Sequence, residues 1–140
     1  MEATNKKGFW IILIIFVLIV VAVQVALPRQ ESTNDANLVI KNQSDQAIGS
    51  IVVEYPRWDG SLVSEGATKA DSSAIEKGDS IYFFKVRWPA VVTVYADTQG
   101  SQPLAQITIA EAPQENCRWK AEIYDLDGEL SVSLACVPKE

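Results

Sequence analysis

The sequence predicts a single N-terminal transmembrane helix followed by an all-β domain, a small antiparallel β-sandwich of about seven to eight strands. Three observations predict this fold class. Residues 9–27 form an uncharged apolar run, short strand candidates separated by turn residues recur from residue 38 onward, and no apolar stripe of helical period follows Leu27. The 140 residues leave room for one compact core plus an appendage, which excludes a second catalytic domain.

The apolar run from Phe9 to Leu27 reads FWIILIIFVLIVVAVQVAL, nineteen residues with Gln24 as the only strongly polar side chain. A helix of this length reaches about 28 Å, close to the roughly 30 Å thickness of the hydrocarbon core. A single span in lipid has to be helical, because every backbone polar group must find its partner inside the segment. Pro28 stops the helix, so residues 28–37 are expected to form a polar linker.

Two other kinds of N-terminal segment share this pattern. A cleaved secretory signal has an apolar region of about 7 to 15 residues, and a cut after Ala26 would place Gln24 where a small residue is needed. The sequence Lys6-Lys7-Gly8-Phe9 resembles the cleavage site of type IV prepilins, a resemblance confined to the leader. This chain has Leu13 where pilins carry Glu, and Pro28 breaks its helix. The length and the proline favour an uncleaved signal-anchor.

The charges that flank the apolar run predict its orientation. Lys6 and Lys7 precede the helix, whereas Arg29 follows it among Glu31 and Asp35. Positive residues stay on the cytoplasmic side of a membrane. We therefore expect a single-pass protein of the plasma (inner) membrane, with residues 1–8 in the cytoplasm and residues 38–140 periplasmic or extracellular.

The composition excludes several classes of function. From Arg29 onward the chain carries 10 Lys and Arg against 17 Asp and Glu, a net charge of 10 − 17 = −7. Such a surface repels phosphates, so we expect no nucleic acid partner. The chain has no histidine, which removes the commonest general base and metal ligand. Two cysteines without histidine cannot complete a zinc shell. We therefore expect no enzyme, no metal and no cofactor.

The β-domain is predicted from eight short segments of strand-like composition with Gly, Pro, Asn or Asp between them. The segments are 38–41, 48–55, 61–64, 81–88, 91–96, 104–109, 118–124 and 129–136. Alternation of polar and apolar residues then predicts which side chains point inward. The expected core is Ile51, Val53, Tyr55, Tyr82, Phe84, Val86, Trp88, Val92, Val94, Ala96, Ile107, Ile109, Trp119, Ile123, Val132 and Leu134.

Eight strands in about 100 residues match the size of an immunoglobulin-like sandwich. The run from Asn42 through Lys77-Gly78-Asp79 loosely resembles bacterial envelope modules of that shape. The resemblance lies at the level of the fold, because the pattern of a Trp between two inter-sheet cysteines is absent. It implies a sandwich and carries over no site residue.

The last two strand candidates predict a hairpin around Asp125-Leu126-Asp127-Gly128. A four-residue loop would place Cys117 directly opposite Cys136, whereas a tighter turn at 127–128 keeps the same faces and makes the two cysteines diagonal. Directly opposed residues suit a disulfide, so we expect the four-residue loop. The bridge would add roughly 3 kcal/mol and indicates an oxidising compartment. The alternative is two free buried thiols.

Two groups of residues are candidates for binding partners. Trp58 lies in a turn with Tyr55 and Arg57 nearby, and these residue types are enriched in binding hot spots. The alternative is that Trp58 packs under its own hairpin. In the apolar run, Ala22 and Ala26 flank Gln24 at a spacing that lets another helix approach and form a hydrogen bond. Lipid-facing alanine is the alternative there.

Two polar motifs are better explained as turns. Asn42-Gln43-Ser44 has the form of an N-glycosylation sequon. Asp125, Asp127 and Glu129 offer carboxylates to Ca²⁺, yet their spacing stops short of a loop that encloses the ion.

Two hypotheses of function follow. The first is a non-enzymatic accessory or assembly subunit of a membrane protein complex, whose partners are the lipid bilayer and other membrane-protein subunits. The alternative is a membrane-anchored envelope binding module, such as an inhibitor, immunity protein or sensor, whose loops around Trp58 and Gln99-Gly100 bind a soluble partner. No feature of the sequence identifies a small-molecule substrate.

Overall fold

A computed structural model of the chain describes residues 11–19 and 32–140, which belong to two separate compact units, residues 1–31 and 32–140. Residues 11–19 are helical and all apolar. Within the described residues, no helix combines the length and the apolar character that crossing a membrane requires. The predicted span 9–27 extends at both ends beyond the described residues, and the predicted segment 1–8 lies wholly outside them.

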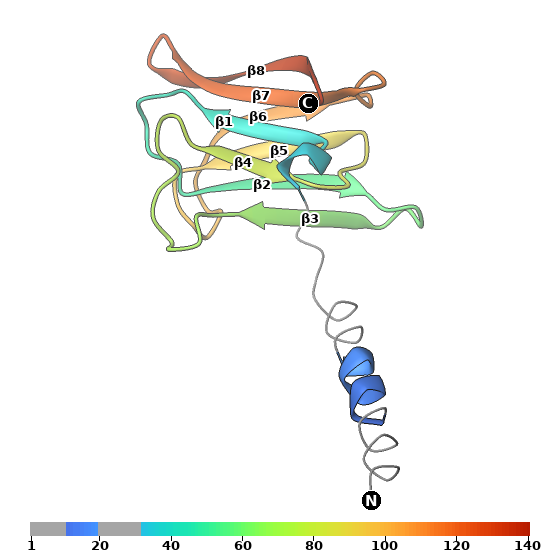
Figure 1. Cartoon of the computed structure of the whole chain (residues 1–140). Coiled ribbons are helices and arrows are strands. Elements are labelled where there is room, and N and C mark those ends of the chain that lie inside the picture. The colour runs from blue at the N-terminus through green and yellow to red at the C-terminus, as the bar shows by residue number, and fades with distance from the viewer. Residues whose placement is uncertain (1–10, 20–31) are drawn as a thin grey trace, which may run out of the picture. The chain divides into compact units, whose positions relative to one another are not determined.

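Residues 32–140 form an all-β sandwich of two four-stranded sheets (Figure 1). One sheet has the order β4-β1-β7-β8 and the other the order β3-β2-β5-β6. A short 3-10 turn precedes the strands. The elements are η1 (Thr33–Asp35), β1 (Leu38–Asn42), β2 (Ser50–Pro56), β3 (Leu62–Ala67), β4 (Ser80–Phe83), β5 (Ala90–Tyr95), β6 (Pro103–Ile109), β7 (Cys117–Leu126) and β8 (Glu129–Pro138).

The strand order confirms a small all-β sandwich but differs from the immunoglobulin order. In an immunoglobulin constant domain the first and second strands share a sheet, whereas here β1 and β2 lie in different sheets. The chain leaves β1 through a turn held by Asn42, whose buried side chain binds the carbonyls of Gln46 and Ile75. This turn carries the chain to the second sheet. β1 instead pairs with β7 in parallel, so the expectation of a wholly antiparallel sandwich is also wrong.

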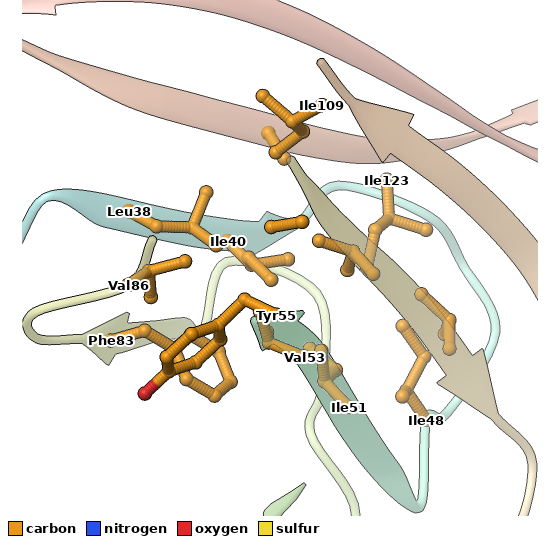
Figure 2. Close-up of a cluster of buried hydrophobic side chains, with 14 of the residues drawn as sticks. Leu38, Ile40, Ile48, Ile51, Val53, Tyr55, Phe83, Val86, Ile109 and Ile123 are labelled. Carbon is orange, nitrogen blue, oxygen red and sulfur yellow. The ribbon is translucent and has the colours of Figure 1, made fainter. Parts of the chain in front are cut away.

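The core lies between the two sheets and is filled from both inner faces (Figure 2). The predicted inward residues of β2 and β5 are buried, as are Ile109 and Ile123. Trp88, Ile107, Trp119, Val132 and Leu134 pack against the core from partly buried positions. Alternation therefore predicted most of the core, because each sheet has one buried and one wet face.

The prediction of one strand over 81–88 is wrong in its length and in which of its residues point inward. β4 ends at Phe83, which is buried, whereas Tyr82 is 38% exposed. Lys85 has a φ of +59°, which interrupts the two-residue alternation, so Phe84 is not in the core and Val86 returns to it. Ala96, also predicted inward, is exposed. The register of β5 and β6 shifts between Val94 and Tyr95, which ends the alternation one residue earlier.

The β7–β8 hairpin has the tighter of the two registers considered. Leu126 pairs with Glu129 and Trp119 pairs with Cys136, so the predicted four-residue loop is wrong. Asp127 and Gly128 both have positive φ, 53° and 85°, which is the geometry of a two-residue turn matched to the twist of the strands. The local turn preference outweighs the benefit of placing the two cysteines directly opposite each other.

Candidate functional site

The turn between β2 and β3 presents Trp58 to solvent, with 83% of its surface exposed. The turn is closed by backbone bonds from Arg57 N to Ser61 O at 2.7 Å and from Gly60 N to Arg57 O at 3.1 Å. The Asp59 carboxylate accepts bonds from the backbone N of Ser61 at 3.0 Å and from its hydroxyl at 2.6 Å. These bonds hold the turn in one conformation. The alternative in which Trp58 packs under its own hairpin is therefore wrong.

Leu62 adds a second large apolar side chain to the same hairpin and is 75% exposed. It begins β3 and pairs with Pro56 at the end of β2. We call Arg57, Trp58 and Leu62 the hairpin-tip surface; Arg57 is exposed as well. The sequence reasoning missed Leu62, although its position directly after a Gly-containing turn, one residue out of phase with inward Val63, indicates an outward side chain.

Tyr55 differs from its two neighbours because it belongs to the core. Its side chain is only 6% exposed, and its hydroxyl donates a hydrogen bond of 2.6 Å to the Glu65 carboxylate on β3 (Figure 2 shows the ring). Burial and this bond to a carboxylate raise the pKa of Tyr55 to about 12. Tyr55 therefore fixes β2 to β3 beneath the hairpin-tip surface instead of contributing contact area to it.

The predicted disulfide is present. Cys117 and Cys136 are bonded with their Cα atoms 5.7 Å apart, within the usual range for such bridges. The two residues are diagonal neighbours, since Cys136 pairs with Trp119 and Cys117 pairs with Pro138. The bridge joins the start of β7 to the end of β8 and closes the open end of this hairpin.

The three candidates for helix docking, Ala22, Gln24 and Ala26, lie outside the described residues. Their role stays a prediction.

The two polar motifs form turns, as their residues predict. Asn42 is fully buried and uses its amide to bind two carbonyls while its oxygen accepts from the backbone and hydroxyl of Ser44. An amide nitrogen in that position is not accessible for glycosylation. The Asp125 carboxylate accepts from Asp45 N at 2.7 Å and from the Gln46 side chain at 3.3 Å, which ties the β7–β8 turn to the β1–β2 loop.

Comparison with known proteins identifies a shared fold and no family. No family model matches the chain, and no curated protein does. Transthyretin from Sparus aurata is similar in structure with a TM-score of 0.50 and 12% identity, over 73% of this chain and 98% of that one. A sea bream transthyretin in complex with thyroxine has a TM-score of 0.49 and 12% identity, over 72% and 96%. At this identity the likeness to the first structure shows the fold alone.

Proposed function

We propose that this chain is a non-enzymatic accessory subunit, anchored in a membrane by residues 9–27, whose β-sandwich docks on a partner protein through the hairpin-tip surface. The observation that carries the proposal is the exposure of Trp58 on a turn closed by its own hydrogen bonds. A turn whose backbone is already ordered loses little entropy when a partner covers it, so more of the contact energy of Trp58 remains for binding.

The magnitude of the contact supports a docking role. A tryptophan buries about 150 to 250 Å² of surface when it is covered, which corresponds to roughly 4 to 6 kcal/mol as an upper bound. Interface tryptophans that act as hot spots typically contribute at least about 2 kcal/mol. Leu62 on the same hairpin enlarges the apolar area, and Arg57 supplies a donor at its rim. Large apolar residues rimmed by polar ones are characteristic of protein interaction sites.

The membrane anchor rests on the N-terminal segment. Residues 11–19 are helical and apolar, and the side chains of this helix are exposed along its length. A helix that is apolar on all sides suits a lipid environment. With Lys6 and Lys7 before the segment, we expect the N-terminus in the cytoplasm and the sandwich in the periplasm or outside the cell, where the disulfide is stable.

The test is chemical crosslinking in native membranes, followed by recovery of the partner with full-length chain. Trp58→Ala and Leu62→Ala should reduce the yield of crosslinked partner, and Trp58→Ala should weaken binding to the recovered partner by about 30-fold. Leu126→Ala is the matched control, because Leu126 is an apolar residue in the β7–β8 hairpin that is 52% exposed. Equal crosslinking by wild type and Trp58→Ala, or a loss caused equally by Leu126→Ala, would refute the role of the hairpin tip.

The same preparation separates the two forms of the proposal. If the chain is an accessory subunit of a membrane complex, scrambling Ala22, Gln24 and Ala26 should prevent the partner from co-purifying with the chain in detergent. In a free-standing binding module, replacement of residues 9–27 by an unrelated span should leave partner binding unchanged.

A further inference from the structure

A second surface, on the outer face of the β4-β1-β7-β8 sheet, goes beyond the proposed function. An open hollow of about 400 Å³ lies on this face. Its lining combines aliphatic, aromatic and cationic side chains. The residues are Val39, Lys41, Ser80, Tyr82, Arg118, Lys120, Val137, Pro138 and Glu140. None of them belongs to the hairpin-tip surface, which lies in the other sheet.

Three cations in the hollow form a regular row. In the parallel pairing of β1 with β7, Lys120 lies level with Val39, and Lys41 lies level with Glu122. Arg118 comes two residues before Lys120 on the same strand. Arg118 and Lys120 are therefore two residues, or about 6.6 Å, apart on β7, and Lys41 lies one further step of two residues along on the neighbouring strand β1, so that the row runs obliquely across the two strands. They point outward, since the alternate residues on the same strands face the core: Ile40 and Ala121 are buried, and Trp119 packs against the core from a partly buried position.

The positive charge of the hollow is opposite in sign to the net charge of the domain. Residues 32–140 carry 9 Lys and Arg and 16 Asp and Glu, a net charge of 9 − 16 = −7, yet three of the nine cations line this hollow. Glu140 is the one carboxylate in the lining. Lys120 is paired with Glu122 beside the hollow, with Nζ 2.8 Å from the carboxylate oxygen.

Each of the three cations has donors left for a ligand, since an ammonium carries three N–H groups and Lys120 uses one of them for Glu122. Lys41 forms no ion pair within the part of the chain that the structure describes. Arg118 donates from Nη1 to the Thr33 carbonyl at 2.9 Å, which holds the guanidinium in place. Its Nε is buried and has no acceptor among the described residues. Because the Nε is buried, a ligand in the hollow would be met by the other N–H groups of the guanidinium, whose planar arrangement suits a carboxylate.

We propose that this hollow binds an extended acidic peptide segment of a partner protein, with carboxylates at every second residue facing Arg118, Lys120 and Lys41. An extended chain repeats its side chains on one face every two residues, which matches the spacing of the row. The hollow is open on its solvent side, whereas sites for small molecules enclose most of the ligand. The aliphatic side chains of Val39, Val137 and Pro138 provide contact area between the charges.

The test measures binding of fluorescein-labelled peptides to the full-length chain in non-ionic detergent micelles by fluorescence anisotropy. The first peptide has the sequence Glu-Val-Glu-Val-Glu, the second has the same composition rearranged to Glu-Glu-Glu-Val-Val, and the third replaces each Glu of the first by Gln. We expect the alternating acidic peptide to bind tighter than both others. Equal binding of the first two peptides would overturn the proposal, because the hollow would then attract negative charge without recognising the spacing of the carboxylates.

Matched variants locate the site. Lys41→Gln should weaken binding of the alternating peptide about fivefold. Lys77→Gln removes the same charge from an exposed lysine outside the hollow and should leave binding unchanged. Equal weakening by the two variants would refute the assignment. Trp58→Ala should not alter peptide binding; a loss there would place the peptide at the hairpin tip and overturn this inference, while a failure of the hairpin-tip test alone leaves it standing.

Discussion

Replacement of Tyr55 by Phe should change how the stability of the domain depends on alkaline pH. The Tyr55 hydroxyl donates to the Glu65 carboxylate at 2.6 Å from a nearly buried position. Tyr55→Phe keeps the ring and removes this bond, leaving the Glu65 carboxylate without that donor. A hydrogen bond to a charged group contributes about 1.5 to 3 kcal/mol, so the variant should lose that amount of unfolding free energy at neutral pH.

The pH dependence follows from the raised pKa. The folded state holds the phenol proton to about 12, against 10.0 for an unperturbed tyrosine, because burial and the Glu65 carboxylate disfavour the anion. The stabilisation is fully present below pH 10 and is lost as the pH rises towards 12, since the unfolded chain releases its proton first. Two pKa units correspond to about 2 to 3 kcal/mol. Tyr55→Phe has no hydroxyl to ionise, so its unfolding free energy should not fall for this reason as the pH rises.

The assay is denaturant unfolding of wild type and Tyr55→Phe at a series of pH values, followed by tryptophan fluorescence. The difference in unfolding free energy between the two proteins should shrink from its neutral value to near zero as the pH approaches 12. Tyr82→Phe, at a more exposed tyrosine, controls for alkaline effects elsewhere. A difference that stays constant over the whole range would refute the assignment of a raised pKa to Tyr55.

Three further predictions concern the scaffold, each measured by denaturant unfolding. Asn42→Ala should destabilise the domain by about 2 to 4 kcal/mol, because it removes four hydrogen bonds of a fully buried side chain and leaves the Ser44 N–H without its acceptor; a change below about 0.5 kcal/mol would contradict this. Gly49→Ala should cost about 1 to 3 kcal/mol, since its Cβ would overlap the backbone of Ala96 and Asp97, whereas the Cβ of Gly66→Ala would meet only the Val52 side chain at van der Waals distance and the change should be nearly neutral. Joint replacement of Cys117 and Cys136 by Ser should remove about 3 kcal/mol, and retention of full stability would show that the bridge constrains little.

The sequence predicted the sandwich because its sheets have one buried and one wet face. On β2, Ile51 and Val53 alternate with outward residues without interruption, so the two-residue period identifies both the strand and its inner face. The prediction fails where a backbone feature breaks the period. Lys85 with its positive φ separates Phe83 from Val86, and no composition signal at a lysine indicates that conformation.

The hairpin register shows a competition between local and long-range preferences. Both registers place the same residues inward, so hydrophobic patterning cannot choose between them. The cysteines favour direct opposition, whereas Asp127-Gly128 favours a two-residue turn. The structure satisfies the turn and still forms the bridge, because diagonal neighbours lie close enough for a disulfide, with Cα atoms 5.7 Å apart.

The row of cations was beyond sequence reasoning because its members come from strands far apart in the chain. Lys41 on β1 and Lys120 on β7 meet only through the parallel pairing of those strands, a pairing that the expectation of an antiparallel sandwich excluded. By contrast, Trp58 was predicted from its turn alone, and Leu62, which was missed, lies on the same hairpin and needs no tertiary information to be found. A binding surface formed by one hairpin can be predicted from a single sequence, whereas a surface formed by several strands can be predicted only when the strand order is known.

The inward position of half-buried Glu65 explains how this domain presents an apolar hairpin tip beside an open sheet edge. β3 is an edge strand, and its inward positions are Val63, Glu65 and Ala67. An inward-pointing charge on an edge strand is one way in which proteins discourage pairing with a second sheet, since another strand arriving there would bury the charge further. The Tyr55 hydroxyl compensates this carboxylate within the native fold. The edge next to Trp58 is thereby protected from unspecific strand pairing, while the tip itself stays available to a partner.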